Sequence, residues 1–311
     1  AGLKNANHYI DASTLKTPQD FENALKSYSV FGRVTPQQKK EMVLALKRLG
    51  HTVAMSGDGV NDVLALKCAD CSVAMASGSD AASNAAQIVL LDSDFSKMPD
   101  VVLEGRRVVN NIQTSASLFL VKNIFSILTT VFTLIAANLY PLYPTQLSLL
   151  GAFTIGTPAF VLALQPNKEL IRGDFLVNVI LKALPAGLAD FIMLAAISIH
   201  GNILGMSNEQ ISTVAIVILL FIGLAALVRI CRPFDGIRIL LCLAMAAGIV
   251  ICVLNFKGIF AITTVNMIML RMIIMYALIA GVLFCIMCKS VGGWIDYMER
   301  HSKRFRRLLK G

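Results

Sequence analysis

The sequence predicts an α/β domain built on a parallel sheet, followed by an all-α membrane domain of six helices. In the first 115 residues, short apolar runs alternate with helical patterns, which is typical of doubly wound parallel sheets. Six apolar segments follow, each near the roughly 20 residues that cross a bilayer. The chain is 56% hydrophobic, which is too apolar for an average soluble domain.

Charge and cysteine usage agree with a membrane protein. Residues 1–116 carry 12 of the 28 Lys and Arg residues and 12 of the 19 Asp and Glu residues, so the apolar part carries the whole net charge of +9. A basic excess between apolar segments indicates anionic lipid neighbours and argues against nucleic acid as a partner. The seven cysteines are odd in number, and five lie in or beside apolar segments, which favours reduced thiols over disulfides.

Capping signals define the first elements of the α/β domain. A helix is expected over Pro18–Ser27 and a strand over Phe31–Val34. The next helix has Thr35 as its N-cap, Pro36 at its first position and Gly50 at its end. The remaining elements are expected as strands at 52–55, 72–75 and 88–91, a helix at 63–69, and a loop with a short helix at 76–82.

The segment Met55–Asp62 is the strongest candidate for chemistry. Gly57 and Gly59 allow the backbone to turn sharply after a buried strand, and Asp58 and Asp62 flank that turn. Two carboxylates at the carboxyl end of a strand suit Mg²⁺ and a phosphate. A surface turn is the alternative, and it would be preferred for a lone Asp-Gly pair but not for the whole segment.

Lys39 lies in the first turn of the helix that begins at Pro36, where a cation opposes the helix dipole. It is either solvated, as expected for Lys40 and Lys47, or directed at a phosphate beside Asp58. The residues by themselves leave both interpretations open.

The membrane segments are expected at about 117–139, 146–164, 184–204, 212–228, 237–254 and 272–288. A helix from Pro99 has no Gly or Pro between Arg107 and Leu139, so it should join the α/β domain to the first segment. Basic residues gather after the second, fourth and sixth segments, which places the α/β domain and both termini in the cytoplasm. The tail 289–311 has a basic, amphipathic pattern, which predicts a helix on the anionic inner leaflet.

Polar residues inside apolar segments are costly and therefore suggest a transport path. The candidates are Lys122, Asn123, Ser126, Thr154, Pro158 and Asp190. Lys122 has an alternative, because a long side chain can extend to the membrane interface. Asp190 has one as well, because it could form a structural pair with Lys122.

At this point the residues resemble those of P-type ATPases, most closely the bacterial cation-transporting ATPase E group of calcium-pump type. The matching segments are Phe31–Lys39, Met55–Asp62 with Leu64–Lys67, Ala74–Gly78, Asp92–Phe95, Glu104–Arg106 and Asn110–Asn111. The resemblance implies part of a haloacid-dehalogenase-like Rossmannoid domain and a pump in the plasma membrane. It implies that ATP drives transport of a cation, Ca²⁺ first, through an aspartyl phosphate.

The resemblance also implies roles for the site residues. Asp58 would be the Mg²⁺ carboxylate on the turn between Gly57 and Gly59, with Asp62 as a second carboxylate at the metal. Lys39 would bind the transferred phosphoryl group, and Asn61 would complete the site with Asp62.

The sequence departs from the family pattern by lacking an Asp-Lys-Thr-Gly-Thr segment. We therefore expect the C-terminal portion of a pump, inactive without its N-terminal part. Its parts would be 1–115 in the phosphorylation domain, 116–288 as the fifth to tenth membrane helices, and 289–311 as a cytoplasmic tail. Competing classes are a membrane-anchored phosphatase, for which no nucleophilic Asp is evident, and a non-catalytic membrane remnant or adaptor.

The transported species is less clearly indicated. Typical calcium pumps carry Glu, Asn and Asp where this chain has Ser126, Gly151 and Ile155, whereas Asn123 and Thr154 match. Lys122 is similar to a Lys of the lipid-moving members, so another cation, a polyamine or a lipid remains an alternative.

Overall fold

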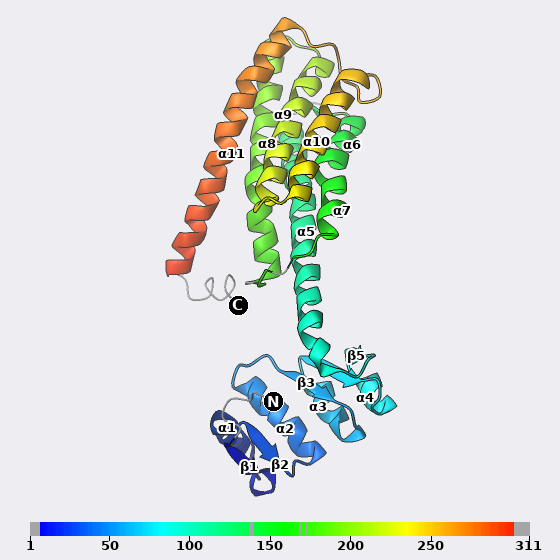
Figure 1. Cartoon of the computed structure of the whole chain (residues 1–311). Helices are drawn as coiled ribbons and strands as arrows, with labels where there is room; N and C mark the ends of the chain where they lie inside the picture. The colour runs from blue at the N-terminus through cyan, green and yellow to red at the C-terminus, as the bar shows by residue number, and fades with distance from the viewer. Residues whose placement is uncertain (1–6, 137–139, 168, 172, 302–311) are drawn as a thin grey trace. The chain divides into compact units, whose positions relative to one another are not determined.

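The structure is a computed structural model that describes residues 7–136, 140–167, 169–171 and 173–301 (Figure 1). The contacts divide it into two units, Ala1–Val101 and Val102–Gly311. Helix α5 (Met98–Ile135) begins in the first unit and runs on into the second, as the absence of helix breakers after Arg107 predicted.

The first unit opens with a small parallel sheet. Strand β1 (Tyr9–Asp11) pairs with β2 (Val30–Gly32), and α1 (Pro18–Ser27) connects them. The bounds of α1 agree with the prediction, whereas β1 was not predicted. Its three residues are too few for a recognisable alternating pattern, and only the pairing with β2 makes it a strand.

A second parallel sheet of three strands lies in the order β3-β4-β5. Its strands are β3 (Ala54–Gly57), β4 (Cys71–Met75) and β5 (Ile88–Leu90), and the connecting helices are α3 (Val63–Cys68) and α4 (Asp80–Ala85). The parallel arrangement was predicted, but as one sheet rather than two. Strand β3 also lies two residues later than expected, because its ladder with β4 extends to Gly57, which pairs with Ala74.

Helix α2 (Pro36–Arg48) shows how local signals set an element. Thr35 and Gln38 form a reciprocal capping box at its start. At its end Gly50 adopts a φ of 87° and donates its amide to the carbonyl of Lys47, the arrangement that favours glycine after a helix. Both ends of the helix therefore follow the prediction.

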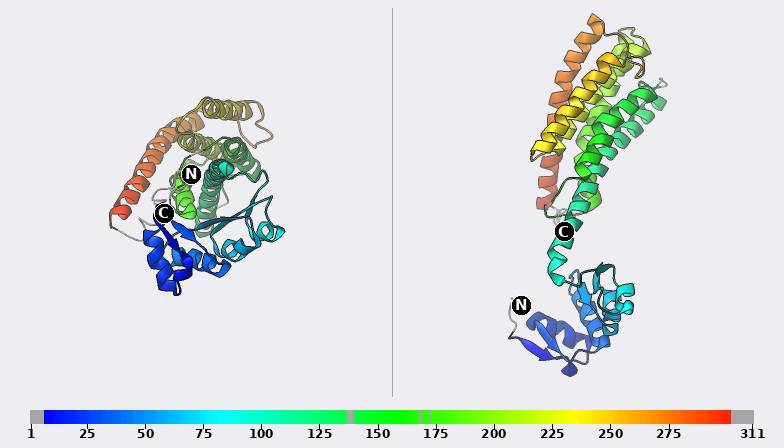
Figure 2. Two further views of the ribbon diagram at one scale, coloured as in Figure 1. Left: turned by 60° about the horizontal axis from the view of Figure 1, so that its bottom comes forward. Right: turned by 45° about the vertical axis from the view of Figure 1, so that its right-hand side comes forward.

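The second unit is a bundle of long helices (Figure 2). They are α5, the broken helix α6 (Pro144–Gly151) and α7 (Thr157–Ala163), α8 (Phe175–Ile203), α9 (Asn208–Ile230), α10 (Gly236–Asn255) and α11 (Met267–His301). Within the described residues, six helical stretches are long and apolar enough to cross a membrane, which confirms the predicted number. The protein is therefore a multi-pass membrane protein.

Helix α9 is the centre of this bundle. The most apolar stretch of α9 is 72% buried, whereas the corresponding stretch of α10 is 17% buried. Ile216 and Leu219 of α9 are fully buried. Helices α8 and α11 pack against α9 and against each other. The apolar side chains of α10 mostly point outwards, as expected for a helix that faces lipid.

Two helices differ from simple spans. A π-helical segment, Ala152–Gly156, separates α6 from α7, where Gly156 and Pro158 both disfavour a regular α-helix. Helix α11 does not end near residue 288 but continues to His301, because Gly292 and Gly293 are accommodated within it. Residues 302–311 of the predicted amphipathic tail lie outside the described residues.

Candidate phosphate and cation sites

The first candidate site lies at the carboxyl end of β3. Lys39, in the first turn of α2, places its Nζ 2.6 Å from Oδ1 of Asp62. Asp62 closes the short 3₁₀ turn after Gly59, whose amide donates to the other carboxylate oxygen at 3.3 Å. The Asp62 side chain is 9% exposed and that of Lys39 is 34% exposed. A salt bridge therefore joins two residues that lie 23 positions apart in the sequence.

Electrostatics keeps Asp62 ionised. Burial raises the pKa of this carboxyl, but the hydrogen bonds from Lys39 and from the Gly59 amide outweigh burial and hold the pKa below its usual value. Lys39 is thus held by a carboxylate at the edge of the sheet. Lys39 is therefore not simply solvated, because its ammonium forms a salt bridge with Asp62.

Asp58 has a different environment from Asp62. It is exposed, and within the described part of the chain no hydrogen bond or ion pair occupies its carboxylate. Its backbone carbonyl accepts a hydrogen bond of 2.7 Å from the amide of Ser79, in the loop after β4. Backbone contacts therefore fix the position of Asp58 and leave its side chain available.

Two glycines make this arrangement possible. A Cβ on Gly57 would lie 2.5 Å from Cβ of Asp62, and a Cβ on Gly78 would collide with the backbone carbonyl of Asp58. Gly57 was predicted as part of the site, whereas Gly78 and Ser79 were not. The signal that could have found them is their position directly after β4, since neighbouring parallel strands end at the same edge of a sheet.

The donor set fits Mg²⁺ through Asp58 better than through Asp62. Both oxygens of Asp62 already accept hydrogen bonds, from Lys39 and from Gly59, whereas the carboxylate of Asp58 is open. Across the described residues, no three His, Cys, Asp or Glu side chains come together. One carboxylate suits Mg²⁺ when phosphate oxygens and water supply the remaining ligands. Asn61, also exposed, lies on the same turn.

The second candidate site is a small cavity among the membrane helices. Lys122 of α5, Thr154 of the π-helical segment and Asp190 of α8 all line it. Its volume of about 10 Å³ is close to the least that one water molecule needs. Three of the six transport-path candidates therefore converge, whereas Asn123, Ser126 and Pro158 do not line this cavity.

Asp190 is the unusual group in this cavity. The residue is 2% exposed, and its Oδ1 has no hydrogen-bond partner among the described residues. It forms no ion pair with Lys122 in that part of the chain, although both face the cavity. The amine of Lys122 lies instead beside Gly151, 3.9 Å from where a Cβ would stand. A buried carboxyl oxygen without a partner is costly, which points to a ligand or a proton at this position.

The neighbouring helix packs closely on Thr154. This residue donates its hydroxyl to the carbonyl of Leu150 at 2.7 Å. Gly223 of α9 faces it, and a Cβ there would lie 2.6 Å from Cγ2 of Thr154. Asn123 is exposed and Ser126 is half-buried on α5. Gly223 was not among the predicted site residues, and its only signal in the sequence is a glycine within an otherwise apolar segment.

Comparison with known proteins gives relatives over most of the chain. The probable cation-transporting ATPase exp7 of Streptococcus pneumoniae is 39% identical over 256 residues, covering 80% of this chain and 33% of that protein. The calcium-transporting ATPase CtpE of Mycobacterium bovis is 43% identical over 257 residues, covering 78% and 32%. A calcium-transporting ATPase of Bacillus subtilis is 35% identical over half of the chain and 18% of its own length. No protein-family model matches.

The chain is a relative of the cation-transporting P-type ATPases. It spans about a third of the length of the exp7 and CtpE ATPases. The small parallel sheets and the six apolar helices are the partial haloacid-dehalogenase-like domain and the membrane bundle that the resemblance implied.

Proposed function

We propose that the complete protein couples ATP hydrolysis, through an aspartyl phosphate, to the transport of a cation, with Ca²⁺ as the first candidate. The observation that carries this proposal is the Lys39–Asp62 salt bridge beside the open carboxylate of Asp58. It occurs in a chain whose relatives include ATPases named for calcium transport. The aspartate that would be phosphorylated belongs to an Asp-Lys-Thr-Gly-Thr segment, which these 311 residues do not contain.

The residues of the first site would act by position and charge. The ammonium of Lys39 would neutralise oxygens of the transferred phosphoryl group, and Asp62 would hold that ammonium in place. Asp58 would hold Mg²⁺, which supplies positive charge to phosphate oxygens when bound. Asn61 would add an amide from the 3₁₀ turn that follows Gly59.

Phosphoenzyme formation in the full-length protein tests this assignment. Asp58→Asn should abolish Mg²⁺-dependent labelling by ATP, because the amide removes the charge that binds the cation. Asp100→Asn, at an exposed carboxylate at the start of α5, is the matched control and should be labelled normally. Normal labelling of Asp58→Asn would overturn the assignment, and equal melting temperatures would establish that both variants fold.

The cavity that Lys122, Thr154 and Asp190 line is the proposed transport site. One carboxylate and a few neutral oxygens are a small donor set for Ca²⁺, which prefers six to eight oxygens. Another cation is therefore an alternative. A polyamine or lipid is a second one, because the ammonium of Lys122 faces the same cavity.

ATPase stimulation of the reconstituted full-length protein decides among these substrates. Stimulation by Ca²⁺ that weakens in Asp190→Asn and Thr154→Ala would support the cation site. Stimulation by a polyamine or lipid alone, lost in Lys122→Ala, would reject the cation and leave the ATPase assignment standing. Absence of any ATPase activity would favour the remnant or adaptor class.

The remaining assignments are proposals as well. We place the protein in the plasma membrane with both termini in the cytoplasm. We keep the divisions 1–115, 116–288 and 289–311, with the basic tail on anionic lipid. The 311 residues alone are expected not to hydrolyse ATP. Labelling of engineered cysteines near each terminus, in intact and in opened cells, tests the orientation.

A further inference from the structure

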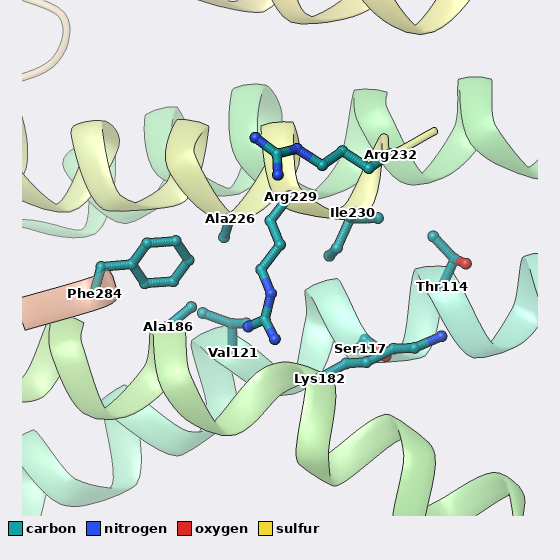
Figure 3. Close-up of a pocket in the computed structure, with 10 residues that line it drawn as sticks. All are labelled: Thr114, Ser117, Val121, Lys182, Ala186, Ala226, Arg229, Ile230, Arg232 and Phe284. Atoms are coloured by element: carbon teal, nitrogen blue, oxygen red, sulfur yellow. The ribbon is translucent and has the colours of Figure 1, made fainter. Parts of the chain in front are cut away.

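A basic pocket lies among α5, α8, α9 and α11 within the second unit (Figure 3). Three cationic side chains line it, Lys182, Arg229 and Arg232, and its volume is about 230 Å³. Lys182 lies in the second turn of α8, and Arg229 lies in the last turn of α9. These two positions are at the same end of the bundle, since α9 runs antiparallel to α8 (Figure 1).

Among the described residues, no salt bridge joins a carboxylate to any of the three cations of the basic pocket, although Glu169 interacts electrostatically with Lys182. Arg229 donates from Nη1 to Sγ of Cys288 at 3.0 Å. The guanidinium of Arg232 lies 5.9 Å from the ring centroid of Phe234. No Asp or Glu of the described chain lines the pocket, and Glu169 lines a smaller neighbouring cavity together with Lys182 and Arg232. The cations are therefore available to an external anion.

The polar atoms that remain in the basic pocket are mostly donors. The hydroxyls of Thr114 and Ser117 both donate to backbone carbonyls of α5, of Asn110 and Gln113. The free hydrogen-bonding capacity is thus dominated by the ammonium of Lys182 and the two guanidinium groups. Guanidinium and ammonium groups bind phosphate oxygens strongly, since these hydrogen bonds are charge-assisted.

Part of the wall of the basic pocket is apolar. Val121, Ala186 and Phe284 form it, on three different helices. Figure 3 shows Arg229 extending between the helices towards the helices that carry Lys182 and Ser117. A pocket of this volume is smaller than most sites for a whole drug-sized molecule or nucleotide. A charged group next to apolar atoms is the chemistry of a phospholipid headgroup and glycerol.

We propose that the basic pocket binds the phosphate group of an anionic phospholipid. Clusters of basic side chains between membrane helices are suited to such headgroups on the side where the membrane surface is anionic. The positive-inside pattern places this end of the bundle on that side. The three cations of the basic pocket do not line the transport cavity, although Val121 and Ala226 line both. The lipid proposal therefore rests on the proposed orientation in the membrane but not on the proposed transport site.

Lipid binding to the full-length protein in neutral detergent tests the proposal. The probe is short-chain phosphatidylglycerol, titrated by native mass spectrometry. Lys182→Gln and Arg229→Gln should each weaken binding about tenfold, because each removes a charge-assisted hydrogen bond. Arg271→Gln, which removes an exposed Arg of α11 outside the pocket, is the matched control and should bind like the unaltered protein.

Two further arms identify the source of the phosphate. Short-chain phosphatidylcholine should bind at least tenfold more weakly than phosphatidylglycerol, because its headgroup carries no net charge. Glycerol 3-phosphate should also bind more weakly, because it lacks the acyl chains that contact the apolar wall. Equal binding of phosphatidylcholine, or equal affinity in all variants, would overturn the site. Tighter binding of glycerol 3-phosphate than of the lipid would overturn the lipid source.

Folding of the variants is controlled separately. Arg229→Lys keeps the charge but loses the planar fork, so its affinity should fall between those of the unaltered protein and Arg229→Gln. Melting temperatures without lipid should agree among all variants. An affinity of Arg229→Lys no higher than that of Arg229→Gln would contradict a charge-based site.

Discussion

Removing the ammonium of Lys39 is the most informative perturbation of the first site. Lys39→Met keeps the aliphatic chain but leaves Asp62, with a side chain 9% exposed, without its closest donor at 2.6 Å. A hydrogen bond to a charged group contributes about 1.5–3 kcal/mol when buried. The 34% exposure of Lys39 reduces this to about 1–2 kcal/mol, because water screens the pair.

Hydrogen exchange of the full-length protein, measured by mass spectrometry, detects the loss of the Lys39–Asp62 interaction at individual segments. The amides of the turn that Asp62 closes, and that of Ser79 bonded to Asp58, should exchange about 5 to 30 times faster in Lys39→Met. Lys40→Met is the matched control, because Lys40 is the next residue of the same helix and forms no ion pair among the described residues. Unchanged exchange in Lys39→Met, or an equal increase in Lys40→Met, would refute the reasoning.

Three further predictions concern the other groups. The pKa of Asp62 is lower in the folded state, so the stability that its carboxylate contributes should be fully present above about pH 4 and lost as the pH falls through the folded pKa. Melting temperatures measured against pH should show this loss. The Asp62→Asn variant should lack this pH dependence. Gly223→Ala should lower the melting temperature through an overpacking cost of about 1–3 kcal/mol against Thr154, whereas Gly281→Ala, whose nearest atom is 3.9 Å away, should not. Asp190→Asn should preserve or raise the melting temperature, since the amide keeps the shape of the side chain and cannot carry a buried charge, yet reduce cation-stimulated ATPase activity at least tenfold; an unchanged cation response would exclude Asp190 from the path.

Local signals in the sequence determined most of the elements. The ends of α2 follow from Thr35, Pro36 and Gly50, because capping and a positive φ involve only neighbouring residues. The number of membrane helices follows from hydropathy, because a bilayer requires a long apolar stretch whatever lies beside it. The break in the second span follows from Gly156 and Pro158, since both weaken a regular helix.

Only the tertiary structure decided which of these residues meet. Lys39 reaches Asp62 because α2 and the turn after β3 converge at one edge of the sheet, and no local pattern encodes that contact. Asp190 was paired with Lys122 as one alternative, yet the two share a cavity without an ion pair in the described residues, because helix packing sets their separation.

The sequence by itself determined the fold class, the helix and strand types and the family resemblance, since these depend on periodicity, hydropathy and short motifs. The tertiary structure decided the separation of the two sheets, the open state of Asp58 and the cluster of Lys182, Arg229 and Arg232 around one pocket. The physical reason is that these features depend on distances between residues far apart in the chain. Such distances arise only when α5, α8 and α9 pack against one another and when neighbouring strands end at one edge.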